Sequence, residues 1–97
     1  MIARIVTMKF DENKIDEFLE LFHTYKSEIR NFEGCNHLSL IQNIKTPNEI
    51  STFSHWVDEN HLNKYRDSEI FKSIWPLTKT LFIEQPQAFS YEILTIA

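Results

Sequence analysis

The segments of this chain that have a strand pattern are apolar on both faces, and this restricts the fold more than any other feature. The first of them, residues 2–10, is rich in β-branched residues and contains neither glycine nor proline. One face carries Ile2, Val6, Met8 and Phe10, and the other carries Ala3, Ile5 and Thr7. A strand of this kind has to be covered on both sides. We expect helices to cover one side and a second copy of the chain, related by a two-fold axis, to cover the other.

The spacing of apolar residues alternates along the chain between the period of strands and the period of helices. Three more strands are predicted, at Cys35–Gln42, Glu49–Val57 and Gln87–Ile96. Helices are predicted where apolar residues recur, from Ile15 to Phe32, from Glu59 to Arg66 and from Glu69 to Phe82. The order is therefore β-α-β-β-(short α)-α-β, with a hairpin between the second and third strands. It predicts a single α+β domain over residues 1–97, with a ferredoxin-like antiparallel sheet.

Residues that favour helix ends stand at the expected places between these segments. Asp11, Asp58 and Ser68 are predicted N-caps, because their side chains can accept a hydrogen bond from the first turn. Gly34, the only glycine, follows the first helix, where a left-handed C-cap needs it. Pro76 lies inside the third helix, where it removes one hydrogen bond and should bend the helix.

The composition excludes several classes of function. The net charge is −4 and the ten Lys and Arg residues form no run, so we expect neither nucleic-acid binding nor binding to a membrane surface. Cys35 is the only cysteine, which rules out an internal disulfide and a zinc site built from cysteines. The first residues lack the long apolar region of a signal peptide, and no stretch is long enough for a membrane span. A cytoplasmic homodimer is the expectation.

Several features of the chain are typical of one family. Residues 54–71 contain a strand that ends in Trp56, a short acidic helix, and a Tyr-bearing turn that leads into a helix capped by Ser68. With the first strand, the helix end at residues 32–35 and the segment at residues 86–90, this stretch resembles the antibiotic biosynthesis monooxygenase family over nearly the whole chain. The resemblance implies a dimeric α+β barrel, in which two sheets pack face to face and each subunit keeps a pocket between its own sheet and helices. The family includes cofactor-free oxygenases that act on aromatic polyketides and quinols, and haem-degrading enzymes.

The chain departs from the haem-degrading branch of this family. That branch uses an Asn near the first strand, a Trp before the Ser-capped helix and an iron-binding His within that helix. Tyr65 and Trp75 stand at the second and third of these positions, and the first strand has Arg4, Ile5 and Val6 but no Asn. Tryptophan cannot ligate iron, so the resemblance disfavours haem degradation, although haem handling through another ligand such as His37 or His55 remains an alternative.

Two residues are predicted to be catalytic. His55 lies mid-strand, and a reference pKa near 6.5 would let it accept a proton from a phenol or hydroquinone. The alternative is a histidine on the sheet face, hydrogen-bonded at the dimer interface. Tyr65, at the end of the short helix, is predicted to donate a hydrogen bond to a ligand. The alternative is a packing aromatic with its hydroxyl in solvent.

Five more residues are predicted to contact the substrate: Trp75, Phe71, Asn63, Trp56 and His37. Phe71 and Trp75 lie about one helical turn apart and could stack on a planar ligand, or they could simply belong to the core. Whether His37 meets His55 depends on the register of the strands. A metal site at this pair would need a third ligand such as Glu49, and no metal is predicted. No cofactor is predicted either, since a chain with one glycine cannot form a P-loop or a dinucleotide fingerprint.

These observations lead to two hypotheses about function. The first is a cofactor-independent monooxygenase that acts on a small aromatic compound, such as a phenol, a quinol or a polyketide-like molecule. His55 would be its base, Tyr65 its hydrogen-bond donor, and Trp75 and Phe71 its stacking walls. The alternative is a non-catalytic dimeric protein that binds a small apolar molecule, because the same pocket lacks a convincing acid–base pair.

Overall fold

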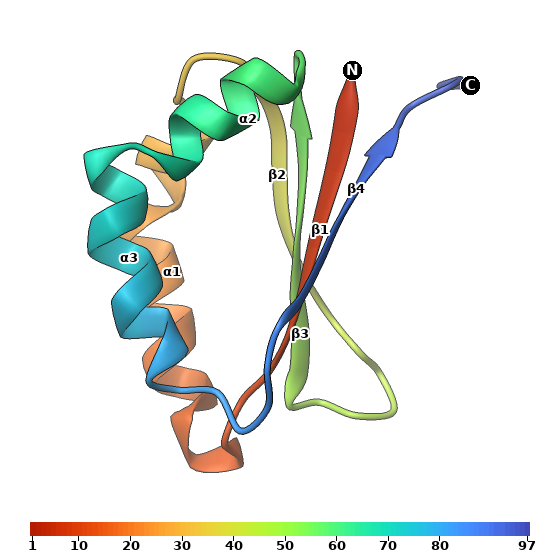
Figure 1. Ribbon diagram of the computed structural model, residues 1–97. Helices are drawn as coiled ribbons and strands as arrows, with labels where there is room; N and C mark the ends of the chain where they lie inside the picture. Colours follow the sequence, from red (N-terminus) through yellow and green to blue (C-terminus); the bar gives the residue numbers. More distant parts are fainter.

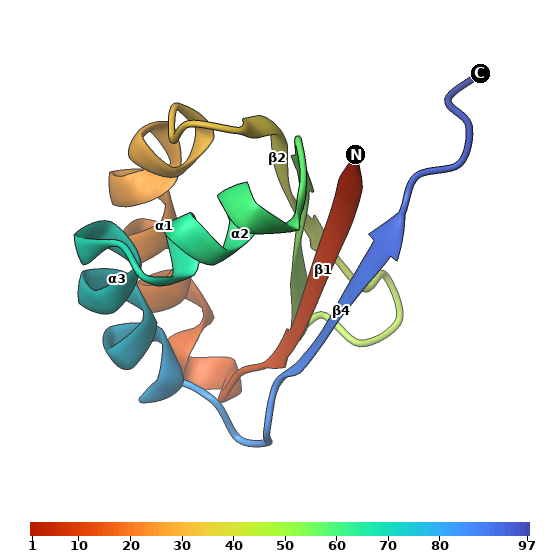
Figure 2. The same cartoon turned by 45° about the horizontal axis from the view of Figure 1, so that its top comes forward.

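The computed structural model of this protein describes residues 1–97 as an antiparallel sheet with helices on one side (Figure 1). The strands are β1 (Ile2–Lys9), β2 (Cys35–Gln42), β3 (Glu49–Trp56) and β4 (Gln87–Glu92), in the order β2-β3-β1-β4. The helices are the 3-10 turn η1 (Glu12–Lys14), α1 (Ile15–Arg30), α2 (Glu59–Arg66) and α3 (Glu69–Lys79). Helices α1 and α3 lie along the sheet, and α2 crosses one end between β3 and α3 (Figure 2). The predicted α+β, ferredoxin-like arrangement is confirmed.

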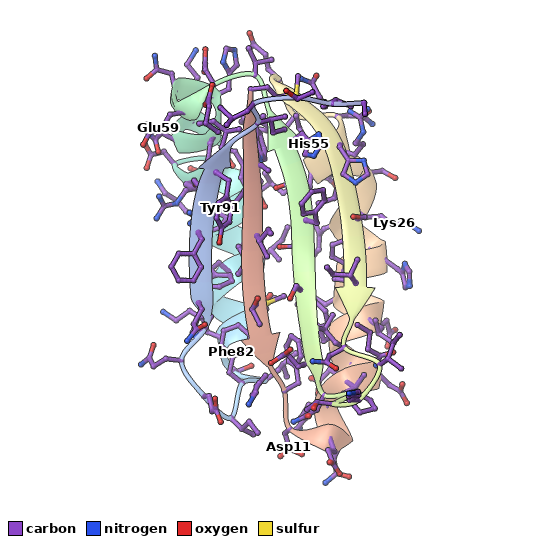
Figure 3. All side chains as sticks on the ribbon, turned by 90° about the vertical axis from the view of Figure 1, so that its right-hand side faces the viewer. Asp11, Lys26, His55, Glu59, Phe82 and Tyr91 are labelled. Atoms are coloured by element: carbon purple, nitrogen blue, oxygen red, sulfur yellow. The ribbon has the colours of Figure 1, made fainter.

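The strand register assigns each residue of the sheet to one of two faces. Leu40, Thr52, Val6 and Ala88 form one row across all four strands, and this row faces the helices. Because side chains alternate along a strand, the neighbouring rows point the other way. One such row contains His37, His55, Ala3 and Tyr91, and Figure 3 shows His55 and Tyr91 on the face turned away from the helices.

Most predicted boundaries agree with the structure, and the differences have local causes. The first helix starts with a separate 3-10 turn, because the Asp11 carboxylate accepts a hydrogen bond from the amide of Asn13. The third helix ends at Lys79 instead of Phe82, since the chain then turns to pair with the end of β1. There the amide of Ile83 donates to the Lys9 carbonyl at 2.9 Å.

Two further boundaries are shorter than predicted. The first helix ends at Arg30, before Phe32, and β4 ends at Glu92 although the alternating pattern continues to residue 96. Helix α3 does not end at Pro76 but continues to Lys79. Asp58 and Ser68 cap α2 and α3 as predicted, by accepting hydrogen bonds from backbone amides in the first turn of each helix.

Gly34 adopts the left-handed conformation that the sequence predicted, with a φ of 88°. It lies in the turn that enters β2, where the Cys35 amide donates to the Phe32 carbonyl at 3.0 Å. Glycine is also needed there for space. A Cβ atom added to it would lie 2.5 Å from the side chain of His61 on α2. The turn and helix α2 are thus packed directly against each other.

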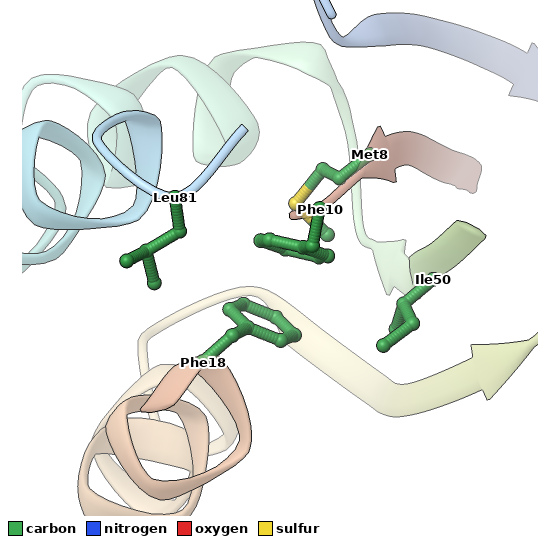
Figure 4. Packing of buried hydrophobic residues seen from close by; sticks show 5 residues of the cluster. All are labelled: Met8, Phe10, Phe18, Ile50 and Leu81. Carbon is green, nitrogen blue, oxygen red and sulfur yellow. The ribbon is translucent and has the colours of Figure 1, made fainter. Parts of the chain in front are cut away.

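The main core lies between the sheet and the lower part of the helical layer. It contains Met8 and Phe10 from β1 and its extension, Phe18 from α1, Ile50 from β3, and Leu81 after α3 (Figure 4). Phe10 is fully buried and stacks on Phe18 with ring centroids 4.2 Å apart. None of the helices combines the length and apolar character of a membrane span.

The outer face of the sheet is not covered by any element of the chain (Figure 3). Ile41, Phe89 and Tyr91 on this face are 50%, 56% and 53% exposed. Large apolar side chains exposed in this position are unusual for a monomer, because exposed apolar patches commonly mark interaction surfaces. The sheet therefore has one face packed within the chain and one apolar face that is free to pack elsewhere.

Candidate functional site

An apolar cavity of about 280 Å³ lies between the helix-facing side of the sheet and all three α-helices. Thirteen of its nineteen lining residues are hydrophobic. This volume is near the lower end of the range of small-molecule sites, about 300–1,000 Å³. The cavity is therefore suited in size and character to a small, mostly apolar molecule.

Four aromatic side chains form a continuous row along the cavity wall: Trp56 from β3, Tyr65 from α2, and Phe71 and Trp75 from α3. Ring centroids are 5.0 Å apart between Trp56 and Tyr65, 5.3 Å between Tyr65 and Phe71, and 5.7 Å between Phe71 and Trp75. The last pair is nearly parallel, at 15°. The sequence predicted all four as site residues, and the structure brings them together.

The turn between α2 and α3 fixes the position of Tyr65. The Ser68 hydroxyl donates a hydrogen bond to the Tyr65 carbonyl, and the same oxygen accepts from the Phe71 amide at 3.3 Å. This one side chain caps α3 and joins it to the end of α2. Tyr65 and Phe71, on either side of the turn, are therefore held on the same wall.

The Tyr65 hydroxyl is the polar group of the aromatic row that has no partner within the chain. The hydrogen bonds that Tyr65 makes outside its helix are all accepted by its carbonyl. No fully buried side-chain atom lacks a partner, so the Tyr65 hydroxyl is not fully buried. Burial raises the pKa of the Tyr65 phenol well above its usual value, and the Cys35 thiol adds to the effect. Tyr65 thus stays protonated and can donate a hydrogen bond, but it is a poor base. By contrast, the Trp56 indole nitrogen already donates to the Ser54 hydroxyl at 3.0 Å.

Two arginines line the same cavity and were not singled out as site residues from the sequence. Arg4 comes from β1 and Arg66 from the last residue of α2. Arg4 Nη1 donates to the Ser90 hydroxyl on β4 at 3.0 Å. The sequence did carry a signal, because Arg4 falls on the same strand face as Val6 and Met8. A charged residue on the inward face of a strand is a candidate for function.

The two predicted histidines lie together on the other face of the sheet. His37 and His55 are direct partners across β2 and β3, with ring centroids 5.1 Å apart. His37 Nε2 lies 3.1 Å from the Ser39 hydroxyl. Neither histidine lines the cavity. The sheet therefore separates His55 from Tyr65, and the predicted site that joined the two is not formed within one chain.

The structure also places Asn63, a predicted substrate contact, and Glu49, which was considered as a metal ligand but not predicted as one. Asn63 is exposed on α2 and does not line the cavity, since its side chain lies on a different side of the helix from Leu62 and Tyr65. Glu49, the conceivable third metal ligand, lies opposite Lys9 in the register of β1 and β3, at the other end of β3 from His55. No group of three His, Cys, Asp or Glu residues is close enough to hold a metal ion.

The histidine pair makes a prediction for the dependence of stability on pH. Burial lowers the pKa of His55 below 6.5, and the neighbouring His37 adds to the effect. Below about pH 6.5 the unfolded chain takes up a proton at His55 more readily than the folded chain does. We therefore expect the free energy of unfolding to fall as the pH drops below that value, and His55→Gln to weaken the fall. Urea midpoints at pH 7.5 and 5.5 check this, and equal pH dependence in both proteins would contradict it.

This chain matches the model of one protein family and is similar in fold to several solved structures. The family model described as "Antibiotic biosynthesis monooxygenase" matches residues 1–75. A solved structure of a conserved protein from Methanosarcina mazei Go1 is 25% identical, with a TM-score of 0.88, and the alignment covers 94% of this chain and 91% of that one. No curated protein matches the sequence.

Two further solved structures have the same fold at lower identity. One is described as an antibiotic biosynthesis monooxygenase. It is 19% identical with a TM-score of 0.90, over 98% of this chain and all of the other. The Rv0793 protein of Mycobacterium tuberculosis is 16% identical with a TM-score of 0.90, over 99% and 97% of the two chains. At these identities the likeness concerns the fold.

Proposed function

Because this chain belongs to the antibiotic biosynthesis monooxygenase family, we propose that it is a cofactor-independent monooxygenase that acts on a small aromatic compound within the cavity. The observation that carries this proposal is the row of four aromatic side chains that includes Tyr65, whose hydroxyl has no partner within the chain. Flat aromatic molecules stack on such walls, and a phenol donor orients a carbonyl or phenolic oxygen. The substrate class is an electron-rich phenol, quinol or polyketide-like compound.

In this chemistry the substrate supplies the electrons. A hydroquinone anion passes electrons to oxygen, and a bond then forms between a ring carbon and one oxygen atom. Loss of water from the resulting hydroperoxide leaves a hydroxyquinone, so that one oxygen atom enters the product and the other leaves as water. The protein has to hold the two reactants together, exclude bulk water and hydrogen-bond the substrate oxygen, which in our proposal is the role of the cavity and Tyr65.

One observation favours the alternative function, a non-catalytic protein that binds small molecules. No His, Asp, Glu, Lys or Cys lines the cavity, so a conventional general base is missing from it. A binding protein needs no base, whereas an oxygenase needs its substrate to be ionised. Measurement of oxygen consumption separates the two functions.

The experiment is oxygen uptake by the purified protein with chelator present and no added cofactor, against a panel of hydroquinones and anthrone-like phenols. We expect uptake above the autoxidation rate with at least one compound, together with a product that carries one added oxygen atom. Heat-unfolded protein at the same concentration is the control. Ligand-induced thermal stabilisation without oxygen uptake across the panel would reject the oxygenase and support the binding protein.

We also propose that two copies of the chain pack through the outer faces of their sheets. The exposed apolar side chains Ile41, Phe89 and Tyr91 support this arrangement, as does the apolar character of both strand faces. Packing of this kind leaves both cavities intact, because each cavity lies on the other side of its own sheet.

Phe89→Glu is expected to separate the dimer, since it would bury a charge in an apolar contact. We expect the dissociation constant to rise by at least about 100-fold, which corresponds to about 3 kcal/mol. Leu77→Glu is a matched control, because Leu77 is 53% exposed on α3, away from the sheet. Sedimentation velocity measures both variants. A wild-type protein that is monomeric at micromolar concentration would contradict the proposed dimer.

A further inference from the structure

The cavity differs sharply in charge from the rest of the molecule. The chain has fourteen Asp and Glu residues, ten Lys and Arg residues and a net charge of −4. The lining of the cavity nevertheless contains Arg4 and Arg66 and no acidic residue. An apolar cavity in an acidic protein therefore carries two positive charges.

Neither arginine is neutralised by a carboxylate. None of the ion pairs of the chain involves Arg4 or Arg66. The one side-chain partner of Arg4 is the Ser90 hydroxyl, which is uncharged and leaves most of the guanidinium donors free. Serine positions the guanidinium group across β1 and β4 without cancelling its charge.

The charge of Arg66 acts on the guanidinium group of Arg4. Burial lowers the pKa of Arg4, and the positive charge of Arg66 lowers it further. Arginine nevertheless remains protonated in proteins, so both charges persist. The charge of the half-buried Arg4 is thus held unfavourably beside the exposed Arg66, and an anion bound next to Arg4 relieves this cost.

We propose that the cavity selects the anionic form of its aromatic ligand, with Arg4 and Arg66 binding the negatively charged oxygen while the aromatic row packs against the ring. Guanidinium groups form short, charge-assisted hydrogen bonds to carboxylate, phenolate or enolate oxygens. The inference rests on the proposed function and deepens it, because it names the charge of the substrate. It also accounts for an oxygenase cavity that has no base. The phenol gives its proton to solvent as it enters the cavity, and the arginines stabilise the anion that binds.

The test uses 4-nitrophenol, whose anion absorbs visible light while its neutral form does not. The compound is a poor electron donor, so binding is measured without turnover. The protein is titrated into 4-nitrophenol at a pH about one unit below the pKa of the free phenol. We expect the visible band of the anion to grow, because the anion binds about tenfold or more tightly than the neutral phenol. 4-Nitroanisole, which cannot ionise, is titrated in parallel through quenching of Trp56 and Trp75, the two tryptophans, both of which line the cavity.

Arg4→Gln and Arg66→Gln are each expected to reduce the affinity for the 4-nitrophenol anion by about tenfold and to leave the affinity for 4-nitroanisole unchanged. Arg4→Lys keeps the charge and should retain part of the preference for the anion. Lys64→Gln removes one positive charge from an exposed position of α2 and serves as the matched control. Circular dichroism melting curves verify that each variant is folded.

The outcomes separate this inference from the proposed function. The inference is overturned if the anion and 4-nitroanisole bind equally well, if neither binds, or if both arginine variants behave as the Lys64→Gln control does. In each of these cases, oxygen uptake with the hydroquinone panel would still support the oxygenase. If the anion is preferred and the preference depends on the arginines, but no compound of the panel consumes oxygen, the inference holds and the proposed oxygenase fails.

Discussion

Gly34→Ala is expected to lower the free energy of unfolding by about 2–6 kcal/mol, which would unfold much of a marginally stable protein. A non-glycine residue at a φ of 88° costs about 1–3 kcal/mol in backbone strain. Overpacking costs about 1–3 kcal/mol more, because the new methyl group would lie 2.5 Å from the His61 side chain. His61 cannot easily move away, since its Nδ1 lies 2.7 Å from the Asp58 carboxylate. Urea unfolding followed by circular dichroism measures the loss.

Gly34→Asn separates the two contributions. Asparagine tolerates a positive φ better than alanine does, but it also carries a Cβ atom. If contact with α2 is important, Gly34→Asn remains clearly less stable than the wild type. A loss of less than about 0.5 kcal/mol in Gly34→Ala, the size of an ordinary surface substitution, would show that neither the turn conformation nor the contact with His61 is needed.

Phe10→Ala is expected to destabilise the protein by about 3–5 kcal/mol, the usual cost of removing a buried phenylalanine ring. Phe10 has no exposed surface and stacks on Phe18 at a centroid distance of 4.2 Å. It also packs against Phe82 at 5.4 Å, so its ring joins β1, α1 and the segment after α3. Figure 4 shows Phe10 among the other buried side chains of this core, Met8, Phe18, Ile50 and Leu81.

The midpoint of urea unfolding measures this effect, and Leu77→Ala is the comparison. Leu77 is also a large apolar residue, but it is 53% exposed on α3, and its removal should change stability by no more than about 0.5 kcal/mol. If the two substitutions had equal effects, Phe10 would not be the central contact of the core that the structure describes.

The fold could be predicted from the sequence because local signals and the hydrophobic pattern agree. Ser68 and Asp58 stand at the starts of helices where only a few residue types cap well, and Gly34 stands where a positive φ is needed. The end of α3 was placed too late, since Leu81 and Phe82 continue the helical spacing. Their backbone instead pairs with the end of β1, which is a long-range contact that spacing does not reveal.

The site was predicted only in part, for a related reason. The aromatic residues Tyr65, Phe71 and Trp75 follow a helical period and a capped turn, and so their common wall could be expected. The face on which His55 lies depends on strand register and alternation, which the sequence did not fix. Arg4 was missed for a different reason, because its place on the same strand face as Val6 and Met8 was not used. Residue type alone suggested a histidine base, whereas the geometry gives a cavity with two arginines and one phenol.

We expect catalysis to take place in the cavity and not at the histidines on the outer face of the sheet. Oxygen uptake by Tyr65→Phe and His55→Gln, measured side by side with the best hydroquinone of the panel, distinguishes these two locations. We expect Tyr65→Phe to lose about 10²-fold in turnover, because a preorganised hydrogen-bond donor is removed, and His55→Gln to keep the wild-type rate. Wild-type turnover in Tyr65→Phe, together with a large loss in His55→Gln, would contradict it and place the chemistry on the other face of the sheet.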